Sequence, residues 1–275
     1  MISGSTRLLA VIGFPVEHSR SPFIHNQFAA QSGADFAYLA FGVTPRTLPD
    51  FIAAARTMNI AGFNVTMPLK EAVLPYLDAL DETSRLCGSV NTVVNRDGRL
   101  FGATTDGAGL VKSLGAREIA GRRVLLLGTG GAARSIAPAL YSAGAAVVAL
   151  SRRDTAMELP GAEVKPWAEL NALSGESDVI INCTPLGMRG AADFADFRFL
   201  DTFAVNRPGG LLCDIVYNPV DTALMKSARS RGLDTLGGLA LLVHQAAESW
   251  RMFTGAAAEG IEEMIKKLEK WEEHS

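Results

Sequence analysis

The sequence has few cysteines, no long hydrophobic run and no excess of charge of either sign. Its 275 residues contain three cysteines, Cys87, Cys183 and Cys213, and this odd, widely spaced set favours neither a disulfide framework nor a zinc knuckle. Lysine plus arginine (26) nearly balances aspartate plus glutamate (29), so the net charge of −3 creates no strong field to attract nucleic acid or anionic lipid. We therefore expect a small-molecule partner, no nucleic-acid partner and a reducing compartment.

Secretion and membrane insertion are also disfavoured. The apolar stretch 8–13 is too short for a signal-peptide core, and the run 239–243 falls far below the ~18 to 20 apolar residues of a membrane span. The composition, 48% hydrophobic and 20% charged, is typical of an ordered globular chain. At ~150 residues per domain the length predicts two domains, in a cytoplasmic protein with no membrane partner.

Short apolar runs alternate with helical patterns along most of the chain, which is typical of βαβ units. A first series runs from a strand at 8–12, through a helix capped by Ser21, to a hairpin with Asp97-Gly98 at its turn. A second series has strands at 124–127, 147–150, 179–181, 211–215 and near 236, and the chain then becomes helical. We predict two α/β lobes, one with a mostly parallel sheet and one Rossmann-like, with a cleft between them and a boundary near residues 105–109.

A glycine-rich turn follows the strand at 124–127. Gly128, Gly130 and Ala133 form G-x-G-x-x-A between this strand and a helix, the context in which a dinucleotide binds. Glycines let the backbone approach a pyrophosphate, and free N–H groups at the helix start stabilise its charge. A tight turn without a ligand is the alternative.

The end of the next strand carries Ser151, Arg152 and Arg153 where an NAD site usually has an acidic residue. Two guanidiniums and a hydroxyl suit a ribose 2′-phosphate, so this segment favours NADP over NAD. The alternative is an exposed basic loop that Asp154 partly neutralises.

Polar side chains gather at strand ends in the first lobe. Hydroxyls of Ser19 and Ser21 could hold a carboxylate, although helix capping explains one of them equally well. Lys70 and Asp106 are ordinarily surface residue types, but a paired lysine in a cleft can supply the proton that hydride transfer to a carbonyl requires. This set, with Asn64, Thr66 and Asn91, predicts a carbonyl/alcohol redox step on a hydroxylated, carboxylated substrate.

Several other chemistries lose support. The four histidines have no HExxH spacing, so no metal site is predicted, and the sequence has no Gly-x-Ser-x-Gly elbow or phosphate-binding Gly-Lys-Ser/Thr loop. Acyl transfer and ATP chemistry are therefore disfavoured.

Five blocks occur in a characteristic order: Pro15-Val-Glu-His-Ser-Arg-Ser-Pro22 with His25-Asn26, Gly62-Phe-Asn-Val-Thr-Met-Pro-Leu-Lys70, Gly88-Ser-Val-Asn-Thr92, Thr105-Asp-Gly107 and Gly128-Thr-Gly-Gly-Ala-Ala-Arg134. Later echoes are Ile181-Asn-Cys-Thr184, Asp214-Ile-Val-Tyr217-Asn-Pro219 and Gln245-Ala-Ala. Together they resemble the shikimate dehydrogenase family of NADP-dependent oxidoreductases over almost the whole chain.

The resemblance implies reversible NADPH-dependent reduction of 3-dehydroshikimate to shikimate in aromatic amino-acid (chorismate) biosynthesis. It implies Lys70 and Asp106 as the catalytic pair, and substrate contacts from Ser19, Ser21, Asn64, Thr66, Asn91, Tyr217 and Gln245. Cofactor contacts are expected from Gly128, Thr129, Gly130, Gly131, Ala132, Ala133, Arg134, Ser151, Arg152, Arg153, Thr184 and Gly238.

The same resemblance gives a domain division. Residues 1–106 with 239–275 are expected to form the substrate-binding catalytic domain, and residues 107–238 the NADP-binding domain, in a monomer or homodimer. The sequence departs from the family at Thr104 and Ser151, where Asn is usual, and at Ala240, where Met is usual. A quinate or amino-shikimate dehydrogenase and a non-catalytic shikimate-binding sensor stay open as alternatives.

Overall fold

The computed structural model describes residues 2–152, 155 and 157–272, with the side chains of the last two left undescribed. The chain divides into two compact units. Unit 1 comprises the chain up to Asp106 together with Gln245–Met264, and unit 2 comprises Gly107–His244 together with the chain from Ile265. No helix among the described residues is long and apolar enough to cross a membrane.

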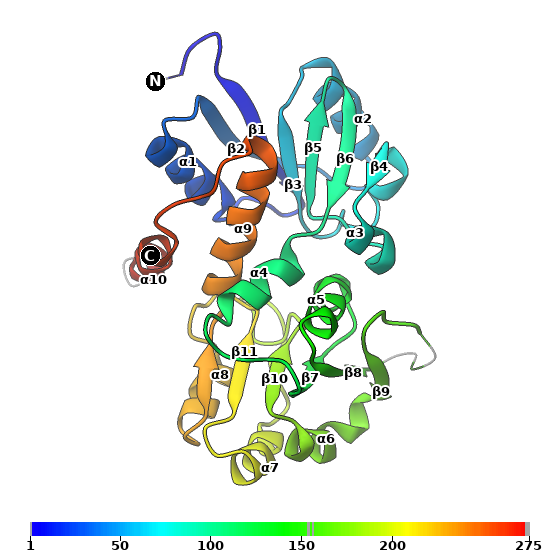
Figure 1. Ribbon diagram of the computed structural model, residues 1–275, viewed down its shortest axis with the longest axis vertical. Helices are drawn as coiled ribbons and strands as arrows, with labels where there is room; N and C mark the ends of the chain where they lie inside the picture. Colours follow the sequence, from blue (N-terminus) through cyan, green and yellow to red (C-terminus); the bar gives the residue numbers. More distant parts are fainter. Residues whose placement is uncertain (1, 153–154, 156, 273–275) are drawn as a thin grey trace. The chain divides into compact units, whose positions relative to one another are not determined.

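Unit 1 is built on a mixed six-stranded sheet (Figure 1). Its spatial order is β2 (Phe36–Gly42), β1 (Arg7–Gly13), β3 (Gly62–Val65), β5 (Thr92–Arg96), β6 (Arg99–Ala103) and β4 (Ala79–Leu80). The pairs β1/β2, β1/β3 and β4/β6 are parallel, whereas β3/β5 and β5/β6 are antiparallel. The predicted hairpin is confirmed, since Asp97 (φ 52°) and Gly98 (φ 84°) supply the left-handed pair that a two-residue turn needs.

Helices cover both faces of this sheet. Ala10, Ile12, Phe63 and Val65 point to one face and pack with α2 (Leu48–Thr57). On the other face, aromatic side chains of α1 (Ser21–Ser32) and α9 (Gly238–Thr254) meet, with Phe28 and Trp250 at 6.1 Å between ring centroids. The remaining helical elements of unit 1 are η1 (Leu74–Tyr76) and α3 (Glu82–Cys87), whereas α4 (Asp106–Ser113) and α10 (Ile261–Glu272) each contain residues of both units.

Unit 2 contains a parallel six-stranded sheet with the Rossmann order (Figure 1). The order is β12 (Asp234–Leu236), β11 (Leu211–Asp214), β10 (Val179–Asn182), β7 (Arg123–Leu127), β8 (Ala146–Ser151) and β9 (Glu163–Pro166). Leu126 and Ile181 pack with α5 (Gly131–Ser142) on one face, and Leu125 and Ile180 pack with α7 (Arg198–Asn206) on the other. Burial of both faces explains why the central strands are apolar at consecutive positions, 124–127 in β7, 179–181 in β10 and 211–213 in β11.

The predicted α/β class is confirmed, and one local prediction, the Ser21 cap of the first helix, is wrong. Arg20, not Ser21, occupies the N-cap of α1, and the Ser19 hydroxyl accepts from the Ser21 N–H at 3.3 Å. After β9 the chain forms a short 3-10 turn, η2 (Trp167–Glu169), and then α6 (Leu170–Glu176). Helix α8 (Ala223–Arg229) lies between β11 and β12, and Thr222 caps it. Strand β9 and helix α7 were not predicted.

Candidate active site and dinucleotide site

Lys70 and Asp106 form an ion pair in unit 1, with 2.5 Å between Lys70 Nζ and Asp106 Oδ2. Lys70 follows β3, and its carbonyl accepts from the Val90 N–H, which fixes the backbone beside β5. Asp106 is the first residue of α4, where the helix dipole stabilises a carboxylate. The exposed fractions of the two side chains, 24% and 13%, leave the pair accessible to a small molecule.

Asn91 holds this pair in place. Its Nδ2 donates to Asp106 Oδ1 at 2.7 Å, to Thr105 Oγ1 at 3.0 Å and to Gln245 Oε1 at 3.3 Å. Its Oδ1 accepts from the Thr105 N–H at 2.9 Å and from Thr92 Oγ1 at 2.9 Å. Both ends of the buried amide are thus engaged by protein groups, so Asn91 orients the Asp106 carboxylate.

Asn64 lies at the centre of a second buried network. Its Nδ2 donates to the Asn91 carbonyl at 3.0 Å and to Ser249 Oγ on α9 at 3.0 Å. Its Oδ1 accepts from the Tyr38 phenol at 2.7 Å, and Tyr38 in turn hydrogen-bonds with Ser21. Burial raises the pKa of Tyr38 well above its usual value, so the phenol stays a donor. A continuous polar chain therefore links Ser21 to the network around Asn91.

Gly13 brings the remaining predicted substrate residues together. A Cβ at Gly13 would lie 2.3 Å from Thr66 Cγ2 and 2.8 Å from the Met67 carbonyl oxygen, so only glycine allows the two strand ends to approach this closely. The Phe14 N–H also donates to the Met67 carbonyl at 3.1 Å. The segment that carries Ser19 and Ser21 is thereby anchored beside Thr66, and both Ser19 and Thr66 are partly exposed.

A cluster of aromatic rings packs around Tyr38, whose phenol belongs to the network of Asn64. The His25 ring stacks on Tyr38 with 4.3 Å between centroids and 2° between planes, and Phe253 lies 5.9 Å away. His25 is 1% exposed, neither ring nitrogen has a hydrogen-bond partner, and burial lowers its pKa to about 3. The imidazole therefore acts as a neutral aromatic ring of the core.

The glycine-rich turn in unit 2 lies at the carboxyl end of β7. Gly128 has φ +105°, and a Cβ there would lie 2.8 Å from Thr184 Cγ2, so the turn requires glycine. Gly130 is the N-cap of α5, which has no side-chain cap and no acidic residue in its first turn. The backbone N–H groups of residues 131–133, with Thr129 before them, precede the first helical bond, which the Arg134 N–H donates to the Gly130 carbonyl at 3.0 Å, and they are suited to an anion.

The residues predicted to select the cofactor end β8. Ser151 is buried, and the exposed Arg152 places its guanidinium carbon 5.9 Å from the centroid of the Trp167 ring. Arg153 lies outside the described residues. In the same unit, Tyr217 is partly exposed after β11, and Gly238 is buried so close to the Ile215 carbonyl oxygen that a Cβ would lie 2.4 Å from it.

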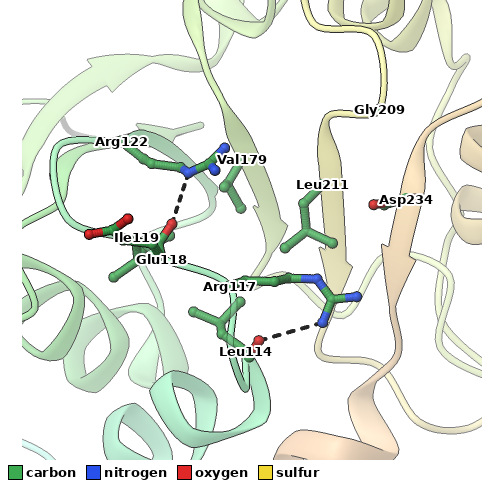
Figure 2. A pocket seen from close by; sticks show the side chains of 9 residues that line it. All are labelled: Leu114, Arg117, Glu118, Ile119, Arg122, Val179, Gly209, Leu211 and Asp234. Carbon is green, nitrogen blue, oxygen red and sulfur yellow. Dashed lines mark hydrogen bonds between the residues drawn. The ribbon is translucent and has the colours of Figure 1, made fainter.

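One pocket in unit 2 lies apart from all of these residues (Figure 2). It opens at the amino ends of β7, β10, β11 and β12, whereas parallel sheets bind ligands at the carboxyl ends. Arg122 and Arg117 at its wall donate to the carbonyls of Glu118 and Leu114. Its lining residues are Leu114, Arg117, Glu118, Ile119, Arg122, Val179, Gly209, Leu211 and Asp234.

Sequence reasoning missed Tyr38, Thr105 and Ser249. Ser249 accepts from Asn64 Nδ2 across 185 positions of the chain. Its spacing of four from Gln245, one helical turn on the same face, was the signal that could have placed it beside the site.

A lysine–aspartate pair in one unit and a glycine-rich turn on a parallel sheet in the other are the parts of a dinucleotide-dependent oxidoreductase. Comparison with known proteins agrees. Residues 11–93 match the model of the shikimate dehydrogenase substrate binding domain, and residues 103–192 match that of the D-isomer specific 2-hydroxyacid dehydrogenase, NAD binding domain.

Full-length relatives narrow the class. A shikimate dehydrogenase (NADP(+)) of Symbiobacterium thermophilum is 40% identical, over 92% of this chain and 90% of that protein. The shikimate 5-dehydrogenase of Thermus thermophilus, solved with NADP(H) and shikimate, has a TM-score of 0.86 at 32% identity, over 96% of this chain and 100% of that one. The enzyme of Listeria monocytogenes, solved with shikimate and NAD, has a TM-score of 0.84 at 31% identity, over 97% and 98%. The chain belongs to the shikimate dehydrogenase family, as its sequence motifs predicted.

Proposed function

We propose that this chain is an NADP-dependent shikimate dehydrogenase that reversibly reduces 3-dehydroshikimate to shikimate. The observation that carries the proposal is the Lys70–Asp106 pair, 2.5 Å apart and oriented by Asn91, in a chain whose relatives bear that activity in their names. A sensor that only binds the metabolite has no use for a proton-transfer pair.

The pair supplies the proton side of the reaction. When bound, NADPH supplies the hydride that goes to the carbonyl carbon of the substrate. Lys70 donates one proton from Nζ to the carbonyl oxygen, so that C=O becomes CH–OH, and it takes that proton back in the reverse direction. Asp106 holds Nζ at a fixed position, which is the positioning that acid–base catalysis requires.

Most of the proposed substrate contacts come from residues of unit 1. Ser19 and Ser21 offer hydroxyls for the carboxylate, and the polar groups of Thr66, Asn64, Asn91 and Gln245 are proposed for the ring hydroxyls. Of these four residues, Asn91 contacts Asp106 directly and Gln245 contacts Asn91. Tyr217 is proposed to contact the substrate as well. The substrate-binding domain is taken as residues 1–106 with 239–275, and the cofactor domain as residues 107–238.

The cofactor side fits NADP(H). The turn from Gly128 to Arg134 offers the N–H groups of residues 131–133, at the start of α5, for the pyrophosphate. Ser151 and Arg152 lie at the end of β8, where a 2′-phosphate is bound in Rossmann sheets, and guanidinium is the group that matches its oxygens. Thr184 and Gly238 complete the proposed cofactor contacts. We further propose that the enzyme acts in the cytoplasm, in chorismate biosynthesis. Its proposed oligomeric state is a monomer or a homodimer.

The test is a four-way assay of nicotinamide absorbance with shikimate or quinate as substrate and NADP or NAD as cofactor. We expect turnover mainly with shikimate and NADP. Turnover mainly with quinate or with NAD would move the chain to a related dehydrogenase, and no turnover in any of the four mixtures would contradict a shikimate or quinate dehydrogenase.

A further inference from the structure

A buried carboxylate in unit 2 takes no part in the reaction proposed above. Asp214, at the end of β11, is 1% exposed, and burial raises its pKa above the usual aspartate value. Three donors meet it. Asn182 Nδ2 and the Val216 N–H reach Oδ1 at 2.9 and 3.1 Å, and the Thr222 hydroxyl reaches Oδ2 at 2.7 Å.

Asp214 and a nearby carbonyl fix the orientation of the Asn182 amide. Asn182 is fully buried, and its Nδ2 faces two acceptors, Asp214 Oδ1 and the Leu186 carbonyl at 3.2 Å. Its Oδ1 faces the Thr184 N–H at 3.0 Å. Since only the NH2 group can face two acceptors, a flipped amide would break all three bonds.

The orientation of Asn182 decides what Thr184 can do. Thr184 Oγ1 lies 2.6 Å from Asn182 Oδ1, an atom without a hydrogen, so the threonine hydroxyl must donate its one proton there. The Leu186 N–H donates to Oγ1 at 3.2 Å and uses one of its two lone pairs. Among the described residues no further donor reaches Oγ1, so one lone pair stays unused, and the hydroxyl has no second proton to give.

The position of Thr184 after strand β10 predicts which half of a bound dinucleotide it would contact. Its methyl group faces Gly128 at the glycine-rich turn, after β10. Strand β10 lies on one side of β7, and β8 with Ser151 and Arg152 lies on the other. Because a dinucleotide crosses the sheet at this turn, with its 2′-phosphate half over β8, the nicotinamide half lies over β10.

We propose that the Thr184 hydroxyl binds the cofactor only as a hydrogen-bond acceptor, because Asp214, acting through Asn182, fixes the direction in which this hydroxyl donates. Thr184 therefore accepts from an N–H or O–H group of the nicotinamide half and never binds a phosphate oxygen. The inference rests on the proposed NADP-dependent function. The nicotinamide half offers two such donors, the carboxamide NH2 and the ribose hydroxyls. Asp214 is a positioning residue, since it acts through Asn182.

The first experiment measures the Kd of NADPH by fluorescence titration without substrate, for wild type, Thr184→Val and Thr184→Ser. Valine keeps the methyl contact with Gly128 and removes the acceptor, whereas serine keeps the hydroxyl. We expect valine to raise Kd about tenfold, the loss of one hydrogen bond of about 1.4 kcal/mol, and serine to stay within about twofold of wild type. Equal Kd values for valine and wild type would overturn the inference.

Two cofactor analogues separate the donors. The 3-acetylpyridine analogue keeps the carbonyl and lacks the NH2, and the thionicotinamide analogue keeps the NH2 and weakens the carbonyl acceptor. A valine effect that disappears only with acetylpyridine identifies the carboxamide NH2, and an effect that persists with both identifies a ribose hydroxyl. An effect that disappears only with thionicotinamide means that Thr184 donates to the carbonyl, which would overturn the proposal.

Variants of Asp214 test whether this residue sets the hydrogen-bonding direction of the Thr184 hydroxyl. Asp214→Asn keeps an oxygen for Asn182 and Val216, while Asp214→Ala removes it. We expect Asp214→Ala to raise the Kd of NADPH severalfold when Thr184 is intact and to change it little when combined with Thr184→Val. Asp214→Asn should leave the Kd nearly unchanged in both backgrounds. Equal effects of alanine in the two backgrounds would show a role independent of Thr184 and overturn that part.

The proposed function and this inference fail in distinguishable ways. A wild-type chain that binds no NADPH contradicts the function itself. A wild-type chain that binds NADPH and turns over shikimate, with valine equal to wild type in Kd, contradicts the inference alone.

Discussion

Lys70 and Asp106 differ in how far their polar atoms are already used. Asp106 engages both oxygens, one with Lys70 and one with Asn91. Lys70 has three hydrogens on Nζ, and among the described residues Asp106 is their hydrogen-bond partner, so hydrogens are left for a substrate oxygen. This difference supports the proposed division of roles, in which Lys70 transfers the proton and Asp106 holds Lys70 in position.

Replacing Lys70 tests this division of work. Lys70→Ala removes charge and proton together, while Lys70→Arg keeps a cation for Asp106 but holds its proton at every working pH. Both variants should lower kcat by about 10³-fold, the size of a lost general acid, with a smaller change in the KM for shikimate. Steady-state kinetics on both variants checks this, and an arginine variant within tenfold of wild-type kcat would show that charge, not proton transfer, is what Lys70 provides.

Most residues of the unit 1 site could be predicted, and the reason is local. Lys70, Asn91 and Asp106 each stand close to the end of a strand, and the ends of neighbouring strands meet at one edge of a sheet. Tyr38 could not be found this way, because an aromatic residue in a strand predicts core packing and says nothing of where its hydroxyl points. Ser249 was missed because its partner Asn64 precedes it by 185 positions, and its spacing of four from Gln245 was the one sequence signal that pointed to it.

At the scale of elements, strand β2 raises the question of how the edge of the unit 1 sheet is protected. It is an outer strand of seven residues without charge or proline, a composition that favours pairing with another chain (Figure 1). The side chain of Asn26 in α1 pairs with the backbone of Tyr38, a residue inside this strand. Its Nδ2 donates to the Tyr38 carbonyl at 2.9 Å, and its Oδ1 accepts from the Tyr38 N–H at 2.9 Å. One side-chain amide thus takes the place of a neighbouring strand.

Asn26→Leu should open that edge. The change leaves the Tyr38 N–H and C=O without a partner, which should destabilise the fold by about 1 to 2 kcal/mol and promote association through β2. Urea unfolding and light scattering across a range of protein concentrations check both effects. Asn206→Leu, at an exposed helix end in unit 2, is the matched control, and equal scattering by the two variants would contradict the role of Asn26.

Elements were predictable where one signal was strong. The Asp97-Gly98 turn fixed the β5–β6 hairpin, and the Gly128 turn fixed the β7–α5 crossover. Strand β9 was missed because Glu163–Pro166 is a short, half-exposed edge strand whose sequence has no apolar alternation. The N-cap of α1 shifted by one residue because the Ser21 hydroxyl is used by Tyr38, a tertiary contact that local pattern does not contain.

At the scale of the whole molecule, His25 couples stability to pH. Its pKa is lowered to about 3 in the folded chain, against 6.5 for the unfolded one, so the unfolded state binds one more proton between these values. The folded state is fully favoured above pH 6.5 and loses about 1.4 kcal/mol for each pH unit as the pH falls from there towards 3.

Removing the imidazole should flatten this profile. His25→Phe keeps a ring against Tyr38 and cannot take up a proton, so its free energy of unfolding should fall less than that of wild type between pH 6.5 and 4. Denaturant titrations at several pH values measure the two slopes. His18→Phe, at an exposed position, is the control, and parallel profiles for wild type and His25→Phe would contradict the assignment of the pH dependence to this side chain.

Unit 1 is made of two separate stretches of chain, and this has a consequence during synthesis. Asn64 and Thr92 leave the ribosome long before Ser249 and Gln245, with the whole stretch Gly107–His244 in between. At ~5 to 20 residues per second, these early residues wait on the order of ten seconds for the partners that complete their hydrogen bonds. During this interval the nascent first stretch of unit 1 lacks α9, so the aromatic face that α9 covers is a target for chaperones and proteases until the last part of the chain emerges.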